Sequence, residues 1–282
     1  MDMNVFKGSD DYVVTKELMN AVNVSIALQK PLLIKGEPGT GKTMLAEAIS
    51  KALDMELIIW GIKSTTKAQE GLYVYDTVQR LYDSQFGEGN VADIKQYIKL
   101  GKLGEAFTAD KQVVLLIDEI DKADEEFEAF LLELLSEMQV TVPELGTLRA
   151  KTTPFVILTS NRARPLSEAL RRRCAYMHID YPDMDKELAI LRKKLPHVDD
   201  RLAAQVALAV QKLRATEAIL KKPSIAETLD WAAALDALGI AELTPEAIRK
   251  TAGFVLKNNE DLLTLAEEQQ EHCGACQGHC HG

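Results

Sequence analysis

Cysteine is nearly absent from the body of this chain. There are four cysteines in 282 residues, and three of them lie in the last eleven residues together with three of the five histidines. A disulfide framework stapling a small core is therefore excluded. The longest purely apolar stretches, such as Val113–Ile117, fall far short of the roughly 20 residues that span a bilayer, so no membrane is expected. The N-terminus lacks a basic segment followed by an apolar one, which predicts a cytoplasmic protein.

Basic residues are also in the minority. The chain has 33 Lys and Arg against 43 Asp and Glu, a formal net charge of −10. Nucleic-acid binders draw much of their affinity from a basic face that neutralises phosphates, so the composition argues against a nucleic-acid partner. The hydrophobic content of 46% and charged content of 27% are those of an ordinary globular protein. The length predicts about two domains.

Short apolar runs alternate with helical patterns over the first two thirds of the chain. Five runs are predicted strands: Pro31–Lys35, Glu56–Ile62, Val113–Ile117, Phe155–Ser160 and Ala175–Tyr181. Continuous apolar runs bounded by turn residues are typical of a parallel sheet that helices cover on both faces. The predicted fold class is therefore α/β in this part of the chain.

Strand signals stop after Pro182, and the rest is predicted to be all-α. Helical patterns cover Met184–Leu195, Asp199–Ala215, Ile225–Leu238, Pro245–Leu256 and Asp261–His272. We therefore expect an α/β domain over residues 1–183, with a hairpin insertion at about 139–150. A helical domain follows over 184–258, and a C-terminal helix with a Cys/His-rich tail over 259–282.

A glycine-rich segment between the first strand and its helix matches the phosphate-loop pattern G-x-x-x-x-G-K-[ST]. It consists of Gly36, Glu37, Pro38, Gly39, Thr40, Gly41, Lys42 and Thr43, followed by Met44. Glycines let backbone N–H groups surround phosphates, and the helix N-terminus adds its positive dipole end. In such a loop Lys42 reaches the β- and γ-phosphates and the Thr43 hydroxyl ligates Mg²⁺. Nucleotide and Mg²⁺ are the predicted cofactors.

Two carboxylates, Asp118 and Glu119, follow the buried strand at 113–117. Asp118 is predicted to hold Mg²⁺, and Glu119 to orient and deprotonate the attacking water. A GTPase would need Asn-Lys-x-Asp, and Asp121–Asp124 lacks the Asn. A small-molecule kinase usually lacks a hydrolytic Glu beside the Mg²⁺ ligand. Hydrolysis of ATP is therefore the predicted reaction.

These motifs, with two further segments, make residues 5–257 resemble the AAA+ ATPases and, within them, the MoxR family. Phe155–Asn161 resembles the sensor 1 strand, which implies that Asn161 orients the attacking water or the γ-phosphate. Ser167–Cys174 resembles the segment with the arginine finger, which reaches a neighbouring subunit's γ-phosphate. Its register favours Arg173, with Arg172 as the alternative. The resemblance implies a P-loop NTPase sheet with an all-α lid.

Two insertions of this family match residues 139–150, the hairpin before sensor 1, and residues 64–104, the helix 2 insertion. The resemblance implies that both project toward a partner or client, with Tyr73, Tyr75 and Tyr82 as candidate contacts.

Two nucleotide-binding elements of the family match this sequence less closely. Ala226 stands where many family members carry a sensor 2 arginine, so Lys221 or Lys222 is the substitute to consider. The base-binding segment of the family matches residues 6–13, where Gly8, Tyr12 and Val13 are candidates for the adenine pocket.

The C-terminal tail is no part of the family pattern. Cys273-x-x-Cys276 is a half-site for Zn²⁺, and Cys280 with His279 or His281 completes four ligands. Thiolates also suit Cu⁺, and imidazoles suit Ni²⁺. A redox-active Cys-x-x-Cys and an unligated tail are the alternatives.

The resemblance implies an ATP-driven, chaperone-like remodeller that promotes maturation or metal-cofactor insertion of a protein client, expected to be a metalloenzyme. It also implies a homohexamer and a partner with a von Willebrand A domain. Two alternatives stay open: a DNA-remodelling AAA+ ATPase, and a metal-delivery protein whose ATPase is regulatory.

Overall fold

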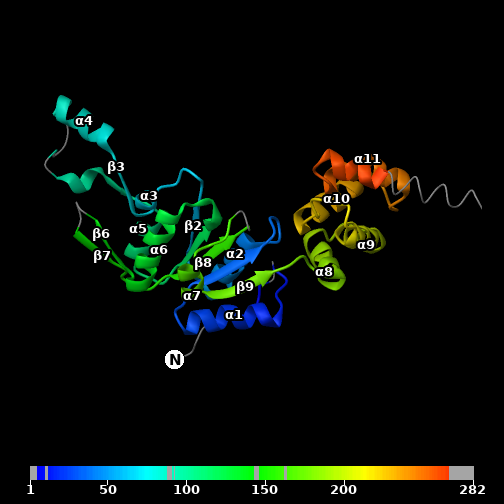
Figure 1. Cartoon of the computed structure of the whole chain (residues 1–282), viewed down its shortest axis with the longest axis horizontal. Coiled ribbons are helices and arrows are strands. Elements are labelled where there is room, and N and C mark those ends of the chain that lie inside the picture. Colours follow the sequence, from blue (N-terminus) through cyan, green and yellow to red (C-terminus); the bar gives the residue numbers. More distant parts are fainter. Residues whose placement is uncertain are drawn as a thin grey trace, which may run out of the picture. The chain divides into compact units, whose positions relative to one another are not determined.

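The computed structural model describes residues 5–9, 12–87, 91, 93–142, 146–161 and 164–266. The chain divides into two compact units (Figure 1). The first comprises Met1–Gly36 and Lys42–Ile179, and the second comprises Glu37–Gly41 and Asp180–Gly282.

A five-stranded parallel sheet forms the centre of the first unit, in the order β2-β5-β8-β1-β9. The strands are β1 (Leu32–Gly36), β2 (Leu57–Gly61), β5 (Val114–Asp118), β8 (Phe155–Ser160) and β9 (Ala175–Ile179). Each of the five predicted runs supplies one of them, which confirms the predicted α/β fold class. Because all strands run the same way, their carboxyl ends meet at one edge of the sheet.

Alternate residues of each strand point to opposite faces of the sheet, and each face is covered by helices. On one face Leu32, Val114 and Ile157 pack with α1 (Lys16–Ala27) and α2 (Lys42–Leu53). On the other, Leu115 and Val156 pack with a second group of helices. These are α3 (Ala68–Leu72), α5 (Lys102–Thr108), α6 (Glu125–Glu137) and α7 (Glu168–Arg173).

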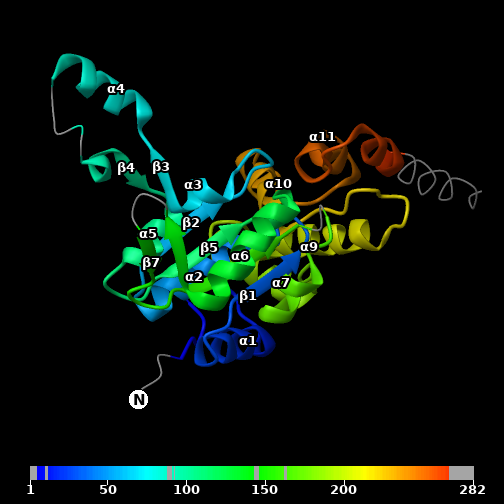
Figure 2. The same cartoon turned by 60° about the vertical axis from the view of Figure 1, so that its left-hand side comes forward.

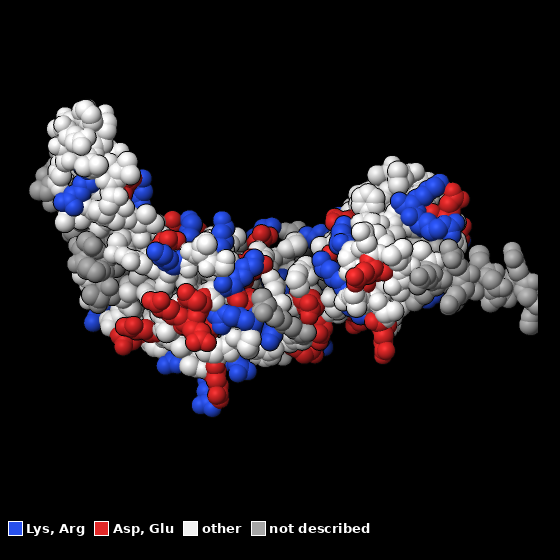
Figure 3. Space-filling view, turned by 45° about the horizontal axis from the view of Figure 1, so that its top comes forward, with Lys and Arg blue, Asp and Glu red and all other residues white. Residues whose placement is uncertain are grey.

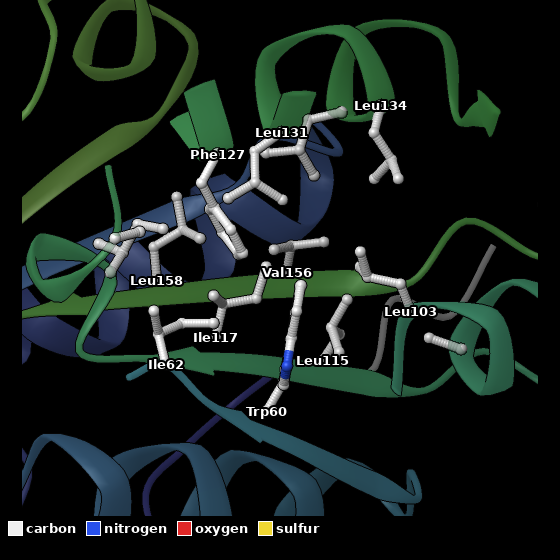
Figure 4. Close-up of a cluster of buried hydrophobic side chains, with 14 of the residues drawn as sticks. Trp60, Ile62, Leu103, Leu115, Ile117, Phe127, Leu131, Leu134, Val156 and Leu158 are labelled. Atoms are coloured by element: carbon white, nitrogen blue, oxygen red, sulfur yellow. The ribbon is translucent and has the colours of Figure 1, made fainter. Parts of the chain in front are cut away.

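The second face holds the larger apolar cluster (Figure 4). Phe127, Leu131 and Leu134 of α6 point onto the sheet, and the Trp60 and Phe127 ring centroids lie 5.1 Å apart. This packing fixes α6 firmly against the strands.

An arm is inserted between α3 and α5. It consists of β3 (Tyr73–Tyr75), α4 (Thr77–Phe86), the 3-10 turn η1 (Ile94–Tyr97) and β4 (Ile98–Leu100), and β3 pairs antiparallel with β4. In both cartoon views α4 stands apart from the sheet (Figures 1 and 2). At the base of the arm a Cβ on Gly101 would lie 2.1 Å from the Glu70 carbonyl oxygen, so only glycine fits there.

The polar side of α4 faces the arm itself. The buried Asp83 carboxylate accepts hydrogen bonds from the Tyr97 hydroxyl at 2.9 Å and from the Gln79 amide at 2.9 Å. A second small insertion, β6 (Gln139–Val142) paired antiparallel with β7 (Gly146–Arg149), follows α6.

In the described part of the second unit, residues 37–41 and 180–266, the regular structure is helical. The helices are α8 (Met184–Lys194), α9 (Asp200–Ala215), α10 (Ile225–Ala237) and α11 (Pro245–Val255), and residues 259–266 are also helical. They enclose an apolar core around Trp231 and a buried ion pair of 2.7 Å between Glu187 and Arg214. In the part of the chain that the structure describes, no helix is both long and apolar enough to cross a bilayer.

Candidate functional site

The phosphate-loop residues connect β1 to α2, as the sequence pattern requires. Gly39 and Gly41 have φ angles of +74° and +85°, in the left-handed region that glycine adopts without strain. Lys42 begins α2 and is 6% exposed, and its ammonium group donates to the Gly36 carbonyl oxygen at 2.9 Å. The lysine side chain therefore folds back onto the last residue of β1.

Thr43 and Asp118 meet at the carboxyl edge of the sheet. The Thr43 hydroxyl donates to Asp118 Oδ2 at 3.1 Å. A hydroxyl and a carboxylate side by side are the oxygen donors that Mg²⁺ prefers, with the remaining positions left for water and phosphate oxygens. The structure thus brings together the two predicted Mg²⁺ ligands.

Glu119 has an unusual backbone conformation for a residue with a side chain. Its φ is +61°, in the left-handed region, a conformation that costs energy outside glycine and often occurs at functional sites. Its backbone N–H donates to Thr159 Oγ1 at 2.9 Å, and Thr159 in turn donates to Asp118 Oδ1 at 2.5 Å. Thr159 therefore holds both carboxylate residues in place.

Sequence reasoning missed Thr159. The feature that could have indicated a role is its hydroxyl group, which lies inside a strand whose six residues are all buried. An unpaired polar group would be costly there, so a hydrogen-bond partner is required.

Both carboxylate oxygens of Glu119 are engaged. The Asn161 side-chain amide donates to Oε1 at 2.8 Å, and Lys122 forms an ion pair with Oε2. The hydrogen bond from Lys122 to Glu119 raises the pKa of the Lys122 ammonium. The Asn161 backbone N–H donates to Asp121 at 3.1 Å. Asn161 thus lies against Glu119, and its role toward the attacking water or the γ-phosphate stays a prediction.

The two candidate finger arginines lie on α7, and both are exposed. Arg172 pairs with Glu168 of its own helix at 2.5 Å. Arg173 Nε donates to the Ser136 hydroxyl of α6 at 2.9 Å. The neighbouring Cys174 packs against the core, and burial raises the pKa of its thiol to about 12.

The second unit contains a cavity of about 430 Å³ beside the crest of the loop. Pro38, Gly39, Lys221, Lys222 and Ala226 all line it. The Lys222 ammonium donates to the Thr216 carbonyl oxygen, and the replacement of a sensor 2 arginine by Lys221 or Lys222 stays a prediction.

The remaining predicted contacts differ in their surroundings. Tyr73 is buried in the core, Tyr75 accepts a hydrogen bond from Arg80 at 2.5 Å, and Tyr82 is exposed. Of these three tyrosines Tyr82 is the exposed one, and contact with a partner stays a prediction. Tyr12 packs against the core, where burial raises its pKa to about 12, and its role at an adenine stays a prediction.

The predicted metal ligands of the tail, Cys273, Cys276, His279 and Cys280, lie outside the described residues.

Comparison with known proteins supports the AAA domain. The family model described as the AAA domain (dynein-related subfamily) matches residues 31–174. An uncharacterized protein of Staphylococcus aureus (strain NCTC 8325) is 29% identical over 226 residues, which cover 76% of this chain and 78% of the relative.

Two solved structures of RuvB from Thermotoga maritima show the same fold. A point mutant aligns with a TM-score of 0.56 at 19% identity, over 90% of this chain and 74% of that chain. The structure described as the RuvB Holliday junction branch migration motor gives 0.53 at 18% identity, over 88% and 72%. At this identity the likeness establishes the fold alone.

Proposed function

This chain belongs to the AAA domain family, in its dynein-related subfamily, and we propose that it is a MoxR-type ATPase that hydrolyses ATP to remodel a protein client. The observation that carries the proposal is the cluster at the carboxyl edge of the sheet. Thr43, Asp118, Glu119 and Asn161 are joined there through hydrogen bonds of 2.5–3.1 Å.

The residues present fit ATP with Mg²⁺, which supply the phosphoryl group and its counter-charge when bound. Lys42 and the loop N–H groups would hold the phosphates, and Thr43 and Asp118 the cation. Glu119 accepts the proton of the attacking water at a carboxylate oxygen. Asn161 and Lys122 each contact one of its oxygens in this structure, and each oxygen keeps a further lone pair for the water.

A ring of identical subunits is part of the proposal. Arg173 is exposed on α7, and its hydrogen-bond partner is Ser136 on α6. An arginine on the surface can serve a site in a neighbouring copy, where it stabilises charge on the transferred phosphoryl group. We propose a homohexamer, as the family resemblance implies.

The exposed surface of the arm supports the proposal of a protein client. One side of α4 consists of apolar side chains that are largely exposed: Val78 at 78%, Leu81 at 59%, Tyr82 at 48% and Phe86 at 64%. They recur at helical spacing, so they share a face of α4 opposite the buried Asp83. In the space-filling view the outer end of the arm is almost free of charged residues (Figure 3). An apolar helical face turned to solvent is typical of a protein contact.

Substitution of this face is expected to abolish client capture. In a Glu119→Gln background, Leu81→Ser with Phe86→Ser should reduce client recovered with ATP by roughly tenfold or more, because buried apolar anchors dominate such contacts. The unfolding temperature should stay the same, since these side chains contact solvent. A matched control is Val24→Ser with Leu28→Ser, a similarly exposed pair in the last turn of α1 and at its C-cap. Equal capture by both double variants would contradict a contact through α4.

The client class and the tail form the finer part of the proposal. We propose a metalloenzyme client and a von Willebrand A partner, with the tail cysteines and histidines binding Zn²⁺, Cu⁺ or Ni²⁺. A chain truncated before His272 is expected to lose roughly one equivalent of tightly bound Zn²⁺ and to keep its ATP turnover. Equilibrium dialysis against Zn²⁺ measures the first and phosphate release the second. If the truncated chain binds as much Zn²⁺ as the full chain, the tail is not the metal site.

The alternative of a DNA motor draws on the likeness in fold to the RuvB Holliday junction branch migration motor, but the net charge of −10 argues against it. ATP turnover that rises with added duplex or single-stranded DNA, and falls again with salt, would favour it.

A further inference from the structure

Arg164 lies three residues after Asn161, in the segment between β8 and α7, and its guanidinium group contacts the start of α6. Nε donates to the Ala123 carbonyl oxygen at 2.7 Å and Nη2 to the Asp124 carbonyl oxygen at 3.3 Å. Nη2 also forms an ion pair of 2.5 Å with Glu128. Asp124 is the N-cap of α6, so the Arg164 side chain binds the residues that begin this helix.

Glu128 extends the connection to α7. Its side chain is 2% exposed, and its second oxygen accepts a hydrogen bond at 2.9 Å from the backbone N–H of Ser167, the N-cap of α7. At the other end of α7, Arg173 donates to Ser136. Glu128 and Ser136 are eight residues apart on α6 and so lie on the same face. Helix α7 is therefore tied to α6 at both of its ends.

The start of α6 is close to Glu119 along the chain. Only the 3-10 turn η2 (Ile120–Lys122) and residues 123–124 separate them. The hydrogen bond from Asn161 to Glu119 spans the other side of the same site. Arg164 and Glu128 thus lie where the base, the sensor and the arginine helix are joined.

We propose that the ion pair between Arg164 and Glu128 is a positioning device, which holds Asn161 and α7 in a fixed relation to Glu119. The inference rests on the proposed ATP hydrolysis. The Arg164 side chain is 28% exposed and that of Glu128 2%. An ion pair with a buried carboxylate adds little to stability beyond what apolar or neutral residues would give, because the carboxylate loses its hydration. The geometry that this pair imposes is therefore its main contribution, and a small displacement of an orienting group is enough to slow a reaction.

A charge-free double variant separates positioning from stability. Arg164→Met alone leaves the Glu128 carboxylate buried without its cation and should lower the unfolding temperature. Adding Glu128→Gln removes that charge and keeps an acceptor for Ser167, so the unfolding temperature should recover. The kcat for ATP hydrolysis should stay roughly 10- to 100-fold below that of the parent, with KM within about twofold. A double variant with parental kcat would overturn the proposal.

The conservative variant Arg164→Lys tests the positioning role without removing the positive charge. Lysine at position 164 keeps the cation but cannot reach both the two carbonyl oxygens and Glu128 as the guanidinium fork does. Arg164→Lys should therefore also lower kcat at unchanged KM, and parental kcat in this variant would equally overturn the proposal. Arg192→Met, which breaks an exposed pair with Asp200 in the second unit, is the matched control.

Failure of the proposed function would look different. In that case the parental chain and its Glu119→Gln variant would release phosphate at the same background rate, whatever stands at position 164.

Discussion

Replacement of Glu119 by glutamine is expected to lower kcat for ATP hydrolysis by roughly 10²- to 10⁴-fold, while ATP still binds. Glutamine keeps the size of the side chain and an oxygen that can accept the Asn161 hydrogen bond, but it cannot take a proton from water. Phosphate release measures turnover, and equilibrium binding of a fluorescent ATP analogue measures affinity. Lys42 and the loop are unchanged in this variant, so affinity should stay within about twofold.

The matched control is Glu125→Gln, a glutamate in the first turn of α6 that is exposed and six residues further along the chain. It changes the charge by the same amount near the site and should leave turnover unaltered. If Glu119→Gln hydrolyses ATP at the parental rate, Glu119 is not the base.

Replacement of Arg173 by alanine is expected to lower kcat by roughly 10³- to 10⁵-fold, with ATP affinity retained. The hydrogen bond to Ser136 is on the exposed surface and contributes little to stability, so the unfolding temperature should hardly change. The same substitution at Arg172 removes an exposed ion pair with Glu168 and serves as the comparison. A larger loss for Arg172→Ala than for Arg173→Ala would assign the finger to Arg172.

Mixed assemblies test whether the arginine acts on a neighbouring copy. A subunit with Glu119→Gln still offers Arg173, and a subunit with Arg173→Ala still offers Glu119. When the two inactive variants are mixed, interfaces that combine both intact residues should regain turnover. Mixtures as inactive as their components would show that Arg173 does not work across an interface.

Much of the fold follows from local pattern. Each apolar run bounded by turn residues became a parallel strand, because burial on both faces leaves no room for polar alternation. The phosphate loop and the pair Asp118–Glu119 were equally readable, since their spacing along the chain is what their chemistry requires. The two lie at one edge because parallel strands end there.

Other parts depend on contacts between distant segments, and no local pattern reports them. Arg164 and Glu128 are 36 positions apart in the sequence. Each taken alone is a charged residue of the kind that usually lies exposed to solvent. The hydroxyl of Thr159 reaches Asp118 and Glu119 because β5 and β8 pair side by side, and this pairing is not visible in the local sequence around Thr159. In α4, spacing could have indicated an amphipathic helix, but the direction of its apolar face depends on Asp83 and Tyr97 pairing within the arm.

The strand order has a consequence for how the molecule folds. The pairing of β5 with β8 joins Val114 to Phe155, 41 residues apart, and that of β1 with β9 joins Leu32 to Ala175, 143 residues apart. Such distant pairings close slowly, because the entropy of large loops is lost before the contacts form. Thr43, Asp118 and Thr159 come together only after β1, β5 and β8 are aligned. A nascent chain therefore gains its nucleotide site late, once nearly the whole α/β unit has emerged from the ribosome.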